Sequence, residues 1–286
     1  MLLIGNRLAE GDGLWVNLIK TTMPLYKSIV VELAKQKQKH NLSGLFGVIG
    51  RFTPLMDVNY GFVRSLSGIL PGLQIPAHLP DQGTVNEDKE LFRLLGFDGI
   101  ETIDQSDYEG AEHIVDMNQP LDNPGLIERF DVIANNGSLE HIFNVPNCLN
   151  NMTKMLKVGG HVIHWVPLNN WVDHGFYQIS PALLIDYYLD NNFAVRDGKI
   201  FQYVFSQSDR ELDIRYVGIN GVPSYATLHY PFASIQGKFD GGMYGYVFVA
   251  QKLKESTATA VPSQSQYSSP LKQKERLDKL TRYWQG

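Results

Sequence analysis

The chain has 286 residues, of which 43% are hydrophobic and 19% are charged, and its formal net charge is −5 at pH 7. This length and composition suit one large α/β domain with additions, or two small domains. The acidic balance gives no reason to expect a nucleic-acid partner, whose phosphate backbone favours a basic surface.

Two further features indicate the compartment. A single cysteine, Cys148, excludes an intrachain disulfide and fits a reducing environment. The first residues lack the basic region and long apolar run of a signal peptide, and no stretch is apolar over the length of a membrane span. We therefore expect a soluble, cytoplasmic protein with no membrane span, and whether it forms a homo-oligomer stays open.

The N-terminal part predicts helices and strands around one irregular segment. Apolar residues at helical spacing predict a helix over 24–38, and an apolar run predicts a strand and turn over 42–50. Residues 53–86 are rich in Pro, Gly and Asn without a clear period, which predicts an irregular insertion or lid. Residues 87–96 predict a short helix that ends on a glycine.

The middle of the chain alternates between strand and helix patterns. Strands are predicted at 99–104, 113–118, 130–135 and 161–167, and helices over 145–156 and from Ser180 to about Asn191. Such alternation is typical of an α/β fold with a mainly parallel sheet.

The C-terminal third changes character. Two strand patterns, at 201–207 and 244–252, predict a late antiparallel hairpin with a polar insertion between them. Residues 256–270 are of low complexity and precede a short amphipathic helix, which we expect to be solvated or to dock on a partner. The predicted organisation is a helical segment at 1–40, an α/β domain at 41–255 with insertions at 53–86 and 206–243, and a linker with a helix at 256–286.

Polar residues follow three of the predicted strands. Asp104 and Asp116 end two successive strands, and the loop over 135–141 after the next strand contains Asn135, Asn136, Glu140 and His141. In an open parallel sheet, ligands bind beyond the carboxyl ends of the strands, and a carboxylate there suits the two hydroxyls of a ribose. The pattern favours a nucleoside-containing cofactor over two carboxylates that only cap turns.

A dinucleotide is the less favoured cofactor. The nearest match to G-x-G-x-x-G is Gly44, Gly47 and Gly50, whose spacing is G-x-x-G-x-x-G. No Tyr-x-x-x-Lys pair, the mark of a short-chain dehydrogenase, is found in the chain. Hydride chemistry, including that of a nucleotide-sugar oxidoreductase, is therefore disfavoured.

Four segments resemble class I S-adenosylmethionine-dependent methyltransferases. GIETIDQSDYEGAEHIVDMNQPL resembles their second and third strands, FDVIANNGSLEHIFN resembles their fourth-strand motif, and MLKVGGHVIHWVP resembles their fifth-strand segment. NNWVDHGFYQISPALLIDYY is similar to the substrate-side extension of a bacterial subgroup often associated with surface-sugar or small-molecule methylation. The similarity is most specific over residues 99–193.

The resemblance implies a fold and a set of cofactor contacts. The fold is a Rossmann-like, mainly parallel seven-stranded sheet with helices on both faces and a C-terminal antiparallel hairpin. The chain departs from the family at the first motif, because LFGVIGRF has no acidic residue before its glycines, and Asp57 is one candidate replacement. The implied cofactor is S-adenosyl-L-methionine, and its implied contacts are Gly47, Gly50, Asp104 (ribose), Asp116 (adenine, in an Asp-x-Asn pattern with Asn118), Met117, Asn136 and Glu140.

The methyl acceptor would lie beside the loops after the fourth and fifth strands. A hydroxyl acceptor benefits from a base near neutral pH, and His141 and His174 are the catalytic candidates. Trp171, Phe176 and Tyr177 are candidates to stack on an acceptor. We assign structural roles to the remaining histidines that lie in or beside strands, which are His113, His161 and His164.

Metal chemistry and thiol chemistry are not expected. The potential ligands Asp131, Glu140, His141, Asp173 and His174 show no tight ligand spacing, so we predict no metal site. Cys148 belongs to the apolar stripe of a helix, which indicates packing rather than nucleophilic reactivity.

Two classes of function follow from the sequence. The first is a methyltransferase that uses S-adenosylmethionine to methylate a hydroxyl of a saccharide or other small polar molecule. The second is a Rossmann-like cofactor-binding or scaffold protein without catalytic activity, which the incomplete first motif favours.

Overall fold

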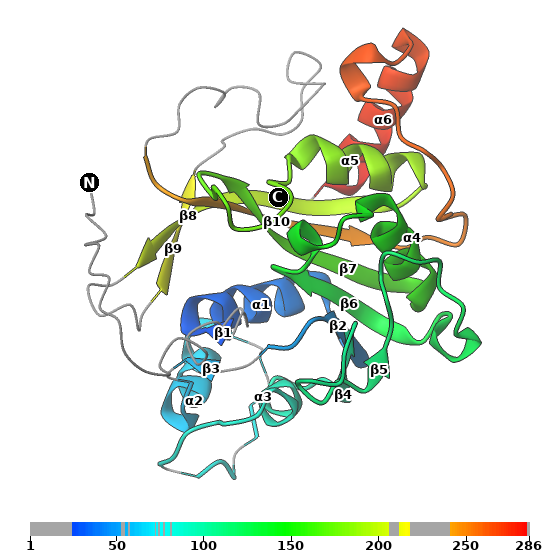
Figure 1. The fold of residues 1–286 in the computed structure, drawn as a ribbon. Coiled ribbons are helices and arrows are strands. Elements are labelled where there is room, and N and C mark those ends of the chain that lie inside the picture. The colour runs from blue at the N-terminus through cyan, green and yellow to red at the C-terminus, as the bar shows by residue number, and fades with distance from the viewer. Residues whose placement is uncertain are drawn as a thin grey trace, which may run out of the picture.

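A computed structural model describes residues 25–284 except 53–54, 57, 72, 74, 77, 81, 206–211 and 218–240. Its centre is an eight-stranded sheet of order β5-β4-β2-β6-β7-β10-β8-β9 (Figure 1). Each of the first five strands is parallel to its neighbours among those five, and β10, β8 and β9 follow in antiparallel pairings. The strands are β2 Leu45–Ile49, β4 Gly99–Asp104, β5 His113–Ile114, β6 Phe130–Asn136, β7 Leu156–Asn169, β8 Ala194–Phe205, β9 Leu212–Val217 and β10 Tyr244–Gln251.

The predicted α/β sheet with its Rossmann-like arrangement and late antiparallel pair is confirmed. Seven of the strands correspond to the predicted sheet, and β9 adds an eighth at the edge, inside the segment predicted as a polar insertion. A separate parallel pair joins β1 (Leu25–Tyr26) to β3 (Leu55–Met56).

Helices cover both faces of the sheet (Figure 1). The strands alternate their side chains between two cores, as the pleat of a strand requires. In β10, Val247 and Val249 belong to the core that contains α1, whereas Tyr246 and Phe248 belong to the core that contains α5. The helices are α1 Lys27–His40, α2 Tyr60–Ile69 and α3 Asp88–Leu94 on the first face, and α4 Val145–Met155, α5 Pro181–Asp190 and α6 Pro270–Tyr283 on the second.

Two predicted elements differ from the observed ones in the N-terminal half. The segment at 53–86 is not wholly irregular, because α2 forms within it and begins at Asn59, whose side chain accepts a hydrogen bond from the Phe62 backbone N–H at 2.8 Å. The strand predicted at 113–118 is only His113–Ile114, because the chain turns at Asp116.

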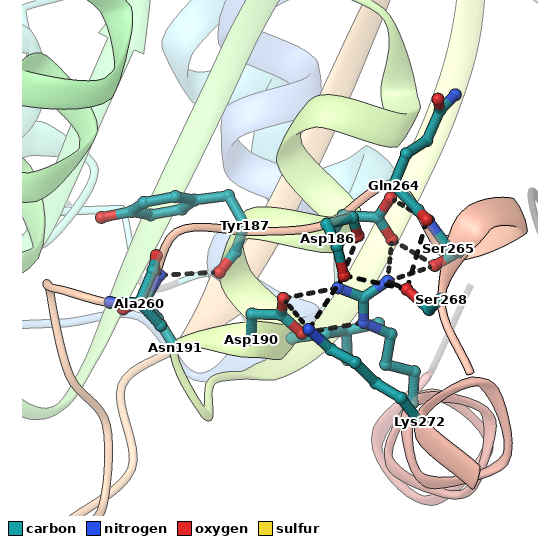
Figure 2. A network of polar contacts seen from close by, with 12 residues as sticks. Asp186, Tyr187, Asp190, Asn191, Ala260, Gln264, Ser265, Ser268 and Lys272 are labelled. Carbon is teal, nitrogen blue, oxygen red and sulfur yellow. Dashed lines mark hydrogen bonds and ion pairs between the residues drawn. The ribbon is translucent and has the colours of Figure 1, made fainter. Parts of the chain in front are cut away.

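The C-terminal helix packs on its own chain, which corrects the expectation of a solvated or partner-docking helix. Arg276 of α6 is 4% exposed and donates to both Asp190 oxygens, at 2.8 and 2.5 Å, and to the Asp186 carboxylate at 3.3 Å (Figure 2). Ser265 donates its backbone N–H to Asp186 at 3.0 Å, so the segment before α6 is tied to the same α5 carboxylates. Leu280 completes the contact from the apolar side, since it is 4% exposed in the core of the second face.

No helix within the described ranges is long and apolar enough to cross a membrane.

Candidate functional site

A cavity of about 460 Å³ opens at the carboxyl ends of β2, β4 and β6. Its volume lies in the range of roughly 300–1,000 Å³ typical of small-molecule sites. The strand order reverses between β2 and β6, and ligands bind at such a point in open α/β sheets. Its walls include six residues that the sequence analysis assigned to the site, which are Gly50, Asp104, Asp116, Met117, Asn136 and His141.

Asp104 and Asp116 lie on the same wall of the cavity. Asp104 is the last residue of β4, and its Oδ1 accepts from the Ser106 N–H at 3.0 Å. Asp116 follows β5, and its Oδ1 accepts from the Asn118 backbone N–H at 2.9 Å. Both carboxylates therefore cap turns through one oxygen, and within the described residues no hydrogen bond reaches the second oxygen of either. Capping fixes their orientation and leaves an acceptor on each for a ligand.

Gly50 lets two loops meet at the floor of the cavity. Its φ of +76° lies in the region that favours glycine, and an added Cβ would lie 2.6 Å from the Ser138 Oγ. Ser138 in turn donates to the Ile49 carbonyl at 2.7 Å. Gly47 is different: it lies inside β2, where an added Cβ would meet the Phe130 ring at 2.8 Å, and it is not among the lining residues.

Arg51 is a site residue that the sequence analysis missed. It lines the cavity directly after Gly50, donates to the Glu109 carbonyl and lies 3.4 Å from Asp88 through Nε and Oδ2. Its position two residues after the end of β2 was the usable signal in the sequence. Asp57, the suggested replacement for that acid, lies outside the described residues.

The loop after β6 is shaped by one asparagine and presents another. Asn135 accepts from the N–H groups of Ser138 and Leu139, at 3.1 and 2.7 Å, and so folds the loop into a single 3₁₀ turn, Leu139–His141. Asn136 lines the cavity at 5% exposure, and neither its Oδ1 nor its Nδ2 has a hydrogen-bond partner within the described residues. A buried, unsatisfied amide is costly, which favours a ligand that bonds to it.

Glu140, His141 and His174 converge beside this cavity. One ligand atom from each lies within 4.8 Å of the others, and His174 Nε2 is 3.5 Å from Glu140 Oε1. The imidazole centroids of His141 and His174 are 5.0 Å apart. Glu140 is fully buried, and burial, followed by the charge of Glu140, raises the pKa of nearby Tyr203, which therefore stays neutral.

The three predicted acceptor-stacking residues lie in and around the segment that contains His174. Trp171 packs against His174 with ring centroids 4.8 Å apart, and its Nε1 donates to the Tyr244 carbonyl at 2.8 Å. Tyr177 donates to the Phe143 carbonyl at 2.9 Å. Phe176 is 66% exposed and meets Phe143, itself 69% exposed, edge to face at 5.6 Å. The sequence analysis did not select Phe143, although it lies within the fourth-strand motif.

The other histidines have structural surroundings, as predicted. His113 Nε2 is 2.7 Å from Glu101, and His164 Nε2 is 2.7 Å from the Tyr188 hydroxyl. Burial lowers the pKa of His161 to about 4, with smaller contributions from His40 and Arg196, and burial alone lowers the pKa of His164 to about 3. Both are neutral over the physiological range.

Two further residues have structural roles. Asp131 bonds to Lys157 and to the Leu45 N–H at the amino end of β6, away from the cavity. Cys148 is fully buried in α4, and burial raises its thiol pKa to about 12, which fits the predicted packing role.

Comparisons with known proteins identify only distant likenesses. A scan against protein-family models and a search of curated proteins found no match. Among solved structures, a candidate methyltransferase from Bacillus halodurans is 13% identical, with 78% of this chain and 99% of that one covered and a TM-score of 0.42. The N-methyltransferase NodS from Bradyrhizobium japonicum is 11% identical, with 78% and 97% covered and a TM-score of 0.36.

A third structure, the branched-chain polyamine synthase from Thermus thermophilus, is 12% identical, with 86% of this chain and 62% of that one covered and a TM-score of 0.39. These values are too low to carry an argument about activity. The function must be argued from the site.

Proposed function

We propose that this protein is an S-adenosylmethionine-dependent methyltransferase that acts on a hydroxyl of a small polar acceptor, such as a saccharide. The observation that carries the proposal is the pair of strand-end carboxylates, Asp104 and Asp116. Both line one cavity, and both have an oxygen that no described residue bonds.

The cavity residues fit the adenosine part of the cofactor. Asp104 ends β4, the neighbour of β2 at the switch point, and a carboxylate there suits the two ribose hydroxyls. In our proposal Asp104 accepts from that diol, while Asp116 and Met117 contact the adenine. Met117 is 4% exposed and supplies an apolar surface for the ring.

Three other lining residues suit an amino-acid group. Asn136 offers a buried amide with both an acceptor and donors, and Gly50 has no side chain of its own to occupy the cavity. Arg51 adds a guanidinium, which can pair with the carboxylate of a methionine moiety. The first motif lacks an acidic residue. In this arrangement Arg51 instead contacts the carboxylate, which is the other charged group of the methionine moiety.

The cofactor supplies a sulfonium methyl that is already activated, so the protein chiefly holds the acceptor in line with it. His141 lies both on the cavity and beside His174, and these two side chains are the candidates to act on the acceptor hydroxyl. Trp171, Phe176 and Tyr177 would border the acceptor on the side of the β7–α5 segment.

Calorimetric titration with S-adenosylhomocysteine tests the cofactor assignment. We expect the unmodified protein to bind one equivalent and Asp104→Ala to bind about 10- to 100-fold more weakly, because a hydrogen bond to a charged group contributes roughly 1.5–3 kcal/mol. Asp107→Ala is the matched control, since Asp107 is an exposed acid in the same loop that does not line the cavity. Absence of binding by the unmodified protein would reject the proposal.

A catalytically inactive cofactor-binding protein is the second candidate, and the missing first-motif acid favours it. Incubation with methyl-labelled cofactor and a panel of hydroxyl acceptors separates the two. Binding without label transfer to any acceptor, with His141→Ala and His174→Ala behaving like the parent, would support the inactive protein.

A further inference from the structure

The cluster of Glu140, His141 and His174 has the geometry of a metal site with its ligands slightly apart. Their candidate ligand atoms lie within 4.8 Å of one another, and Glu140 Oε1 is 3.5 Å from His174 Nε2. Ligand atoms about 2.0–2.2 Å from a tetrahedral ion lie roughly 3.3–3.6 Å apart. The Glu140–His174 distance already falls in this range, and rotation of the exposed His141 side chain would bring in the third ligand atom.

The burial of Glu140 calls for a cation. The side chain is 0% exposed, and neither carboxylate oxygen has a hydrogen-bond partner within the described residues. No lysine or arginine among the described side chains forms an ion pair with it; its only such contact is His174, whose Nε2 is itself without a hydrogen bond. A buried carboxylate that accepts no hydrogen bond and has only a histidine at 3.5 Å as an ion-pair contact is unfavourable, and coordination of a metal is one arrangement that compensates its burial.

The backbone is built to hold His174 over this carboxylate. The N–H groups of Phe176 and Tyr177 donate to the Glu140 carbonyl at 2.8 and 3.3 Å. Gly175 permits that approach, because an added Cβ would lie 2.9 Å from the same carbonyl oxygen. Asp173, just before His174, adopts a φ of 59°, an unfavourable value for a residue with a side chain.

We infer that Glu140, His141 and His174 bind a divalent transition-metal ion of the zinc type. Two imidazoles and one carboxylate are borderline ligands that suit Zn²⁺ and similar ions better than Mg²⁺ or Ca²⁺. Three protein ligands leave at least one position open. The ion would lie beside the cavity, since His141 is one of the lining residues.

This inference replaces the sequence-based expectation of no metal. The local sequence shows only the adjacent pair Glu140 and His141, and His174 comes 33 residues later, in the loop after β7. The three ligands converge because that loop folds back on the Glu140 carbonyl, which no ligand spacing in the sequence reveals.

The role of the ion, but not its binding, rests on the proposed function. An acceptor hydroxyl at the open position would have its pKa lowered by the ion and release its proton to solvent. The oxygen then forms a bond to the methyl carbon as the carbon–sulfur bond breaks and its electron pair stays on sulfur. The imidazoles serve as ligands in this arrangement, so neither is needed as a general base.

Titration of chelator-treated full-length protein with Zn²⁺, followed by calorimetry, tests the site. We expect one ion per chain, and binding weakened at least about 100-fold in Glu140→Gln, His141→Gln and His174→Gln, because each loses one of three ligands. Co²⁺ gives a second readout, since its visible absorption changes when imidazole and carboxylate replace water. His78→Gln and His161→Gln are matched controls and should bind as the parent does: His78 is exposed, and His161 lies near His40 in another part of the fold.

Absence of stoichiometric Zn²⁺ binding by the parent would overturn the inference, and so would loss of binding in His161→Gln but not in His174→Gln. If Glu140→Gln fails to fold, His174→Gln becomes the deciding variant, because His174 is partly exposed and its replacement leaves the core intact. S-Adenosylhomocysteine titrated into the metal-free protein tests the proposed function separately. Binding of that ligand without any metal binding would reject the ion and leave the cofactor assignment standing.

Discussion

Arg51 sets the charge balance of the cavity. Among the described lining residues it is the only lysine or arginine, whereas Asp104, Asp116 and Glu109 are acidic. Its guanidinium donates to the Glu109 carbonyl and lies 3.4 Å from Asp88. It is therefore the one cation of the described lining that a carboxylate group of a ligand could pair with.

Replacing Arg51 with Met should separate recognition of the two ends of the ligand. We expect Arg51→Met to weaken S-adenosylhomocysteine about 10-fold while adenosine binds as before, because only the former has a carboxylate for the guanidinium. Calorimetry with both ligands measures this. Arg93→Met, an exposed arginine on α3, is the control. Equal weakening of both ligands would show that Arg51 acts by holding the Glu109 loop instead.

The roles of single residues could be predicted from the sequence to different degrees. Asp104, Asp116 and His141 could be placed at the cavity because each follows a strand, and the ends of parallel strands share one edge. Gly47 shares the composition of such a motif but lies two residues too early, inside the strand. Position relative to the strand end, rather than residue type, decides which side chain reaches the ligand.

At the scale of elements, the contact between α5 and α6 depends on one arginine. The Arg276 guanidinium bonds to Asp186, Asp190 and Ser265, and Lys272 bonds to Asp190 at 2.8 Å (Figure 2). Burial alone would raise the pKa of Asp190, but hydrogen bonds from Arg276 and Lys272 outweigh it and lower that pKa. At Asp186, by contrast, burial outweighs the hydrogen bonds from Ser265 and the charge of Arg276, and it raises the pKa.

Removing Arg276 should destabilise the protein strongly. We expect Arg276→Met to reduce the free energy of unfolding by about 3–5 kcal/mol, since the buried Asp186 loses its ion-pair partner and Asp190 keeps only Lys272. Lys274→Met, an exposed change on the same helix, should stay within about 0.5 kcal/mol of the parent. Urea unfolding measures both. Equal stability of the two variants would contradict a stabilising role for the network.

Sequence patterns predicted the elements unevenly, for physical reasons. Strands and helices with long apolar runs, such as β6 and α4, were predicted close to their bounds because both faces of the sheet are covered. The helix α2 was missed because the surrounding segment is rich in Pro, Gly and Asn, although the buried Val63, Leu66 and Leu70 keep helical spacing. The docking of α6 was missed because its buried side includes an arginine, whose burial depends on acids about 90 residues away.

For the whole molecule, buried neutral histidines govern stability in mild acid. The pKa values of His161 and His164 are about 4 and about 3 in the folded protein, below the ordinary value of 6.5. The unfolded chain therefore binds more protons below pH 6.5, so stability falls as the pH decreases from 6.5 toward the folded values.

Between pH 7 and pH 5 we expect each of these histidines to cost about 2 kcal/mol of unfolding free energy. Urea unfolding at several pH values should show this slope, and His161→Gln combined with His164→Gln should flatten it, whatever constant loss the replacements cause. His78→Gln, at an exposed site, should keep the parent slope. An unchanged slope in the double variant would assign the acid sensitivity to other groups.

The candidate site could be predicted only where it depends on strand ends. The Rossmann-like sheet places Asp104, Asp116 and Asn136 together, and that sheet follows from local patterns. The approach of His174 to Glu140 depends on a long-range backbone contact, Phe176 N–H to the Glu140 carbonyl. Contacts of this kind are set by the packed molecule and have no local signature.

The isolation of Cys148 has a practical consequence. Its sulfur is the sole thiol of the chain and is sealed in the interior between α4 and the sheet. A thiol-specific dye can reach it only when α4 separates from the sheet, so the labelling rate would measure how often this part of the structure opens. No engineered cysteine would be required to measure this opening.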